Sequence, residues 1–88
     1  MDETYKTVLR SIERMFLAIN TDISYGKIIQ TSDHLDIIKV FLQDVKSKSP
    51  IDKRAQIDNQ VRISIQFIRT KNVSIPDNIN DQLNNMLN

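Results

Sequence analysis

Apolar residues recur every three or four positions over most of the chain, which is the spacing that places them on one face of a helix. The first helix is predicted from the apolar stripe of Tyr5, Val8, Leu9, Ile12, Met15, Phe16 and Ile19, and the charged residues Lys6, Arg10, Glu13 and Arg14 fall outside this stripe. We expect this helix to end near Asn20-Thr21-Asp22, because short polar side chains compete for backbone hydrogen bonds.

The next segment is interrupted before a second helical pattern begins. Gly26 and several polar residues break up residues 23–31, which predicts a loop or a short helical turn there. Ser32 is suited to cap a following helix, and Asp33 complements the positive end of its dipole. The second helix then shows Leu35, Ile38, Phe41, Leu42 and Val45 at helical spacing, with Ile37 beside them, and ends in Lys46-Ser47-Lys48.

A third helix is predicted to start at Ser49-Pro50-Ile51-Asp52, with Ser49 as its cap and proline at its first position. Ile57, Val61, Ile65 and Ile68 continue it at three- and four-residue steps. A rival pattern alternates strictly over 61–67 and again over 73–75, which would indicate a β-hairpin within 61–75. The helix is favoured because two strands without a third are marginal in water.

The last predicted helix begins at Pro76, with Asp77 in its first turn. Its apolar face consists of Ile79, Leu83, Met86 and Leu87. Four helices with one apolar stripe each, joined by short connections, bury those stripes against one another. The sequence therefore predicts an all-α fold, a small antiparallel four-helix bundle, with residues 1–88 forming one domain.

Composition excludes several classes of chemistry. The chain has 88 residues, no cysteine and a single glycine, Gly26. Disulfides, thiolate zinc sites and glycine-rich phosphate loops are therefore not expected. His34, the only histidine, lies beside Asp33 and Asp36, but a surface position near a helix end explains it sufficiently. We predict no catalytic, cofactor-binding or metal-binding residue, and hence a protein that is not an enzyme.

Paired carboxylates at helical spacing could in principle share a cation. The pairs are Asp33 with Asp36 and Asp77 with Asp81. Hard metal ions normally collect about six oxygen ligands, which these pairs do not supply. Their proximity to helix starts explains them as partners of the helix dipole.

Charge is unevenly distributed along the chain. The first 44 residues carry 5 basic and 7 acidic side chains, whereas the last 44 carry 7 and 4. The excess forms a basic patch of Lys46, Lys48, Lys53, Arg54, Arg62, Arg69 and Lys71. Nucleic acid is not the expected partner, because aromatic residues are nearly absent from this patch and the net charge is only +1. Peripheral contact with an anionic membrane surface stays open.

The first six residues are acidic and lead directly into the amphipathic pattern, unlike the basic start and apolar run of a signal peptide. No run approaches the about 18 apolar residues of a membrane span. We expect a cytoplasmic protein that visits the inner face of the membrane at most transiently.

The chain resembles the class IIa, or pediocin-like, bacteriocin immunity proteins of bacteria over most of its length. The resemblance lies in a leading amphipathic helix, a second helix over 35–45, a proline-started third helix, and a polar corner that leads through an apolar-x-apolar-Pro step into the last helix. The corner and its flanks read Ile65-Gln66-Phe67-Ile68-Arg69-Thr70-Lys71-Asn72-Val73-Ser74-Ile75-Pro76.

The resemblance implies a four-helix protein that protects a producing cell from its own pore-forming peptide. It implies binding, from the cytoplasmic side, to a membrane-embedded receptor complex, the mannose phosphotransferase permease with bound bacteriocin. Recognition in this family tends to lie in the carboxy-terminal half. Partner-binding residues are therefore sought among outward-facing positions of the third helix, the corner and the last helix: Arg62, Arg69, Lys71, Asn72 and Asn84.

Two other interpretations remain open. The chain could be a small helical regulatory adaptor, for instance a phage-borne one, that binds a protein or nucleic acid through its basic third helix. It could also be an obligate oligomer, since a bundle this small can hide leftover apolar surface in a dimer.

Overall fold

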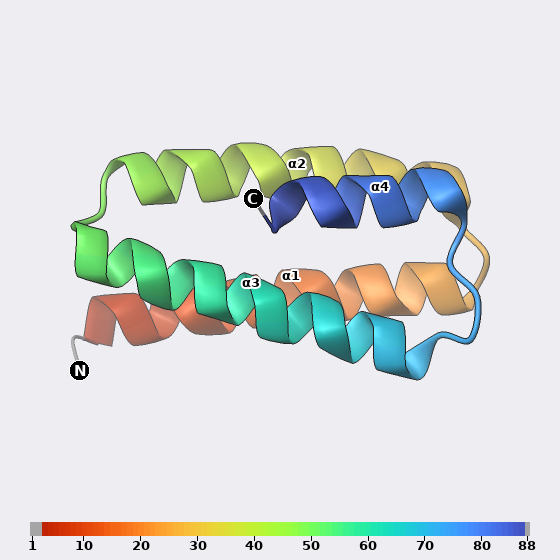
Figure 1. The fold of residues 1–88 in the computed structure, drawn as a ribbon, viewed down its shortest axis with the longest axis horizontal. Helices are drawn as coiled ribbons and strands as arrows, with labels where there is room; N and C mark the ends of the chain where they lie inside the picture. Colours follow the sequence, from red (N-terminus) through yellow and green to blue (C-terminus); the bar gives the residue numbers. More distant parts are fainter. Residues whose placement is uncertain (1–2, 88) are drawn as a thin grey trace.

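The computed structural model describes residues 3–87, which fold into four helices: α1 (Glu3–Ser24), α2 (Ile28–Ser47), α3 (Ile51–Lys71) and α4 (Asp77–Met86). No strand occurs among these residues, so the predicted all-α four-helix fold is confirmed and the alternative hairpin over 61–75 is wrong. The chain runs in opposite directions along consecutive helices (Figure 1). The molecule is 36 Å long and 19 × 17 Å across.

The helices differ in how they pack. α1 lies along α3 in the most extensive contact of the bundle, α2 packs on α1, and α4 packs mainly on α2. α4 has only 10 residues and ends near the middle of the bundle (Figure 1). Four helices therefore cover one half of the core, and three cover the other.

One core joins all four helices. It consists of Ile12, Phe16, Ile19, Ile23, Leu35, Ile38, Leu42, Ile57, Val61, Ile65, Ile68, Ile79 and Leu83. The stripes predicted from spacing supply most of these residues, and Tyr5, Val8, Leu9 and Met15 pack against them at the edge. Ile37 was placed beside the second stripe but is mostly exposed. Apolar spacing thus located both the helices and their buried faces.

The first helix extends beyond its predicted end. α1 continues to Ser24, because the polar residues there bond within the helix: the Thr21 hydroxyl donates to the Leu17 carbonyl at 3.2 Å and the Ser24 hydroxyl to that of Thr21 at 2.7 Å. Gly26, with φ 71°, then ends it. The Gly26 and Lys27 amides donate back to carbonyls of the last turn at 3.0 Å, the pattern of a Schellman motif.

The predicted loop at 23–31 is wrong over most of its length. α2 starts at Ile28, so Ser32 lies inside the helix and does not cap it. Ile28 and Thr31 extend the stripe of Leu35 toward the amino end, and Thr31 is fully buried. Its hydroxyl donates to the Lys27 carbonyl at 2.7 Å, which satisfies the one polar atom that burial would otherwise penalise.

The start of α3 differs from its prediction by one residue. Pro50 has extended φ and ψ and occupies the N-cap position, with no side-chain cap. Ser49 instead donates its hydroxyl to the Val45 carbonyl at 2.7 Å and so satisfies the end of α2. The polar residues 69–71 that were expected in the corner belong to α3, which continues to Lys71, so the connection to α4 spans residues 72–76. The last helix is as predicted, except that Pro76 is its N-cap and Leu87 its C-cap.

Candidate functional site

The five predicted partner-binding residues do not all face outward. Arg69 is half-buried and donates from Nε and Nη2 to the Asn80 Oδ1 at 3.2 and 2.8 Å, and from Nη2 to the Asn84 Oδ1 at 2.6 Å. Arg69 therefore joins α3 to α4. Asn84, which is exposed, belongs to the same cluster.

Asn72 is also half-buried and fastens the corner. Its Nδ2 donates to the Ile68 carbonyl at 2.7 Å and to the Asn20 Oδ1 at 2.8 Å, which links the end of α3 to α1. The outward orientation expected of Arg69 and Asn72 is wrong, because both side chains are used to hold helices together. Partner binding by any of the five residues stays a prediction.

The other two are exposed and make local contacts. The Arg62 Nη2 donates to the Asn59 Oδ1 one turn earlier on α3. The Lys71 ammonium lies 5.6 Å from the centre of the Phe67 ring. Both side chains point to solvent and remain accessible to a partner.

The cations of the basic patch form contacts with other residues of the same chain. Arg54 donates from Nε to the carbonyls of Lys46 and Ser49, both at 2.9 Å, and Lys53 lies 5.2 Å from the centre of the Tyr5 ring. Lys46 pairs with Asp58 at 2.6 Å and Lys48 with Asp44 at 3.0 Å. Each cation of the patch thus has a contact within its own chain. Exposed contacts of this kind are weak, so they lower rather than remove its capacity for phosphate.

An apolar groove runs between α1 and α3. Leu17, Ile63 and Phe67 are 41%, 51% and 39% exposed along it, and it encloses about 270 Å³. Its lining consists of Glu13, Phe16, Leu17, Gln60, Ile63, Ser64 and Phe67, which we call the α1–α3 groove. Ser64 is buried at its floor and accepts a hydrogen bond from the Gln60 amide at 3.1 Å. A groove lined mainly by apolar side chains, with few polar groups, suits an apolar side chain of a partner.

Sequence reasoning did not identify this groove. Ile63 and Phe67 lie outside the apolar stripe that forms the core face of α3. In the sequence they belong to the alternating pattern of residues 61–67, which was interpreted as a possible strand. The usable signal was their four-residue separation within a helix, which places both on one face outside the core.

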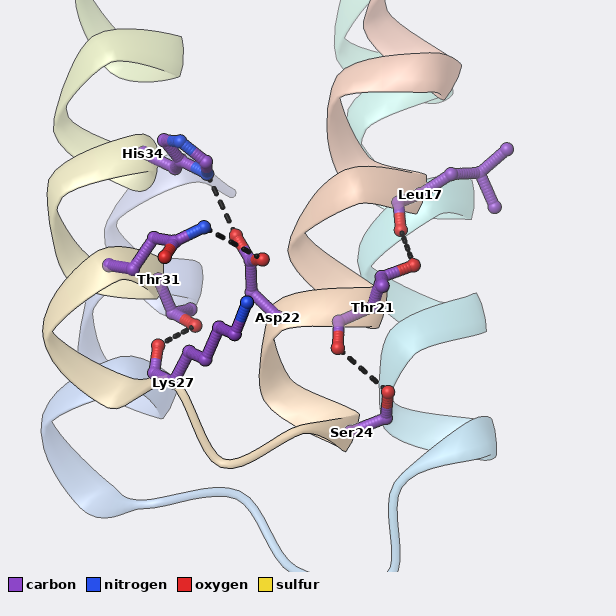
Figure 2. A network of polar contacts seen from close by, with 8 residues as sticks. Leu17, Thr21, Asp22, Ser24, Lys27, Thr31 and His34 are labelled. Atoms are coloured by element: carbon purple, nitrogen blue, oxygen red, sulfur yellow. Dashed lines mark hydrogen bonds and ion pairs between the residues drawn. The ribbon is translucent and has the colours of Figure 1, made fainter.

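A carboxylate–histidine pair closes the corner between α1 and α2 (Figure 2). Asp22 is buried, and its Oδ2 lies 2.8 Å from the Nδ1 of His34, while its Oδ1 accepts from the Gln30 amide at 3.2 Å. The Asp22 carbonyl also accepts the Lys27 amide, so the backbone and side chain of one residue both hold the turn.

Asp22 and His34 lie outside the lining of the α1–α3 groove. A general base needs a substrate within hydrogen-bond reach, and His34 does not line the α1–α3 groove. Over residues 3–87, no group of three or more His, Cys, Asp or Glu side chains is placed to hold a metal ion. The arrangement is explained by its role in fastening two helices.

Comparison with known proteins assigns no relative. No known protein family, no curated protein and no solved structure matches the chain. Within the described part of the chain, none of the helices combines the length and apolar character needed to span a membrane.

Proposed function

We propose that the chain is a non-enzymatic binding protein of the bacteriocin-immunity type. It protects the cell that makes it from a pediocin-like pore-forming peptide by binding the peptide-occupied receptor, the mannose phosphotransferase permease, from the cytoplasmic side. The family resemblance of the sequence suggests this activity, and the four-helix fold with its helix–corner–helix end supports it.

The observation that carries the proposal is the α1–α3 groove. Ile63 and Phe67 belong to the third helix just before the corner, in the half of the chain where the resemblance places recognition. A soluble helix normally keeps apolar side chains of this size off its outer face, and a partly exposed apolar hollow is a typical docking site. Lys71, which lies over Phe67, would contribute a cation at the rim.

A killing assay tests the proposal. The chain is expressed in a strain sensitive to pediocin-like peptides, and survival is measured against a panel of those peptides. We expect protection from at least one peptide. Unchanged killing by every peptide, with the chain present at normal levels, contradicts the proposal.

Matched variants then test the groove. Leu17→Ser with Ile63→Ser removes apolar surface from the groove, and Ile51→Ser removes an exposed apolar side chain elsewhere. We expect the groove variant to lose most of its protection and Ile51→Ser to keep it. Immunoblots and circular dichroism establish that both variants accumulate and fold. Equal protection by both variants would show that the binding surface lies outside the groove.

The nucleic-acid alternative rests on the basic patch, in which Lys46 and Lys48 pair with carboxylates and the other cations contact neutral groups of their own chain. A filter-binding assay at low salt separates the two proposals, since phosphate binding weakens steeply as salt is raised. We expect no salt-dependent retention of nucleic acid.

A further inference from the structure

The side of α2 that points away from the core carries apolar side chains where a surface helix normally carries polar ones. Ile29 is 80% exposed, Ile37 65% and Val40 66%. Their spacing of eight and three residues places them along one stripe, opposite the buried Leu35 and Leu42. Isolated exposed apolar residues are ordinary, but here Ile37 and Val40 are neighbours on one face, and Ile29 lies two turns before Ile37 on the same face.

Three exposed carboxylates share this stripe. Asp33, Asp36 and Asp44 lie at the same helical positions, between and beside the apolar residues. We call the six residues Ile29, Asp33, Asp36, Ile37, Val40 and Asp44 the acidic α2 stripe. It has no residue in common with the α1–α3 groove.

The negative charge of the stripe is only partly balanced. Asp44 pairs with Lys48 at 3.0 Å, and Asp36 accepts a hydrogen bond from the neutral Gln82 amide of α4 at 3.2 Å. In the described part of the chain, neither Asp33 nor Asp36 forms an ion pair. The exposed Lys39, three residues after Asp36 on α2, offsets a further part of this charge. The stripe therefore offers apolar contact together with a partly compensated negative charge, which attracts cationic partners.

The apolar side chains and carboxylates of the stripe together favour one kind of binding partner over others. An anionic membrane surface or a nucleic acid would be repelled by the three carboxylates. A second copy laid against the same stripe would bring six carboxylates into one interface, which disfavours a dimer through this face. A cationic helix, in contrast, matches both the apolar contacts and the charge.

We propose that the acidic α2 stripe docks a cationic amphipathic helix of another protein. The apolar face of that helix covers Ile37 and Val40, and its lysines or arginines pair with Asp33 and Asp36, the carboxylates of the stripe that form no ion pair within the described part of the chain. Such helices bind through apolar anchors at three- and four-residue spacing, and the charges set orientation and association rate. The inference does not depend on the proposed immunity function, because it concerns a different surface.

The test uses a defined probe with the full chain. The probe is a synthetic 18-residue peptide of leucine and lysine, with its leucines on one helical face. It is titrated into ¹⁵N-labelled protein at low salt while backbone amide shifts are followed. We expect the largest shifts at the outward positions of α2 between residues 29 and 44. A peptide with glutamate in place of lysine is expected not to bind.

Two stripe variants and one control assign the contacts. Ile37→Ser with Val40→Ser is expected to weaken binding about tenfold, as loss of central apolar anchors does. Asp33→Asn with Asp36→Asn is expected to weaken it about fivefold at low salt, and the difference should shrink at high salt. Ile51→Ser, which removes an even more exposed apolar side chain outside the stripe, should bind the peptide as the unchanged chain does.

Several results would overturn the inference. They are absence of shifts at low salt, shifts gathered at Leu17, Ile63 and Phe67, and equal binding by the stripe variants and Ile51→Ser. Sedimentation that shows a dimer, lost in Ile37→Ser with Val40→Ser, would make a second copy the occupant and likewise overturn it. The killing assay of the proposed function can fail independently of all these measurements.

Discussion

Two corners lie at the same end of the bundle and are held in different ways (Figure 1). The corner between α1 and α2 is a three-residue turn closed by backbone hydrogen bonds around Gly26. The corner between α3 and α4 spans residues 72–76, and side chains hold it: Asn72 reaches α1, and Arg69 reaches α4.

The two corners differ in how far apart in the sequence the hydrogen-bonded residues lie. The backbone bonds of the first corner join residues at most five positions apart, so that turn can form as soon as its helix ends do. The Asp22 side chain then adds bonds to Gln30 and His34, 8 and 12 positions away. The bonds between helices at the second corner join residues 11 to 52 positions apart. Those of Arg69 exist only when α4 has returned to the bundle, and that of Asn72 with Asn20 exists only when the end of α3 lies beside α1. Substitutions at Gly26 of the first corner should therefore cost backbone strain, whereas at the second corner substitution of Arg69 should loosen α4 and substitution of Asn72 should loosen the end of α3.

The largest effect is expected from Arg69→Ala. It removes three hydrogen bonds from a charged donor and leaves a ten-residue helix, too short to be stable alone, with a weaker attachment to α3. We expect the free energy of unfolding to fall by about 2 kcal/mol, measured by urea denaturation. Arg62→Ala, which removes only a local exposed contact, should cost less than about 0.5 kcal/mol. Equal losses would mean that Arg69 does not anchor α4.

Gly26→Ala should break the first corner. No atom lies within 4 Å of the position that its Cβ would occupy, so the cost comes from the positive φ alone. We expect a loss of about 1.5 kcal/mol in the free energy of unfolding. Gly26→Asn should lose less, because asparagine tolerates this conformation. If both variants lose the same amount, something other than backbone conformation sets the cost.

Asn72→Ala should weaken the second corner less than Arg69→Ala does. It removes the bond to Asn20 and the cap on the Ile68 carbonyl, for a loss of about 1 kcal/mol. A double-mutant cycle with Asn20→Ala isolates the bond between helices, for which we expect a coupling of about 0.5 kcal/mol. Strict additivity would show that the two amides do not interact in solution.

The smallest effect is expected from lengthening the second corner. Two glycines inserted after Ser74 add loop entropy but break no hydrogen bond that holds the corner, so we expect a loss of roughly 0.5 kcal/mol. The same insertion after Tyr25 separates the bonded groups of the first turn and should cost more. Thermal unfolding of the two insertion variants compares them directly. The reverse order would refute the distinction between the corners.

The sequence was sufficient for the elements that depend on periodicity. Ile12, Phe16 and Ile19 needed only three- and four-residue spacing to be recognised as core, and Pro76 marked the start of α4. The same reasoning failed at Thr21, Asp22 and Thr31, because a polar residue within a helix was taken as a boundary. Each of these side chains satisfies its polar atoms locally or across the turn, so the helix continues.

The candidate site was less predictable for a different reason. Nothing local distinguishes Arg69 from Arg62, since both are cations on the same predicted helix. The two differ only once α4 has returned to the bundle and brought Asn80 and Asn84 opposite Arg69. Arg69 then links two helices, whereas Arg62 stays exposed to solvent. The outward stripe of Ile37 and Val40 also required the packed bundle, because the core face of α2 had first to be assigned.

The short length of α4 makes the two ends of the molecule unequal. Among residues 3–87 no helix lies over the seam between α2 and α3 past Met86, and a small hollow there is bordered by Leu42, Val61 and the ion pair of Lys46 with Asp58. Backbone amides in that thinner end should exchange with solvent sooner than those beside α4, since fewer layers must separate to admit water. Breathing motions of the protein should consequently begin at the end that holds the α2–α3 link, far from both corners discussed above.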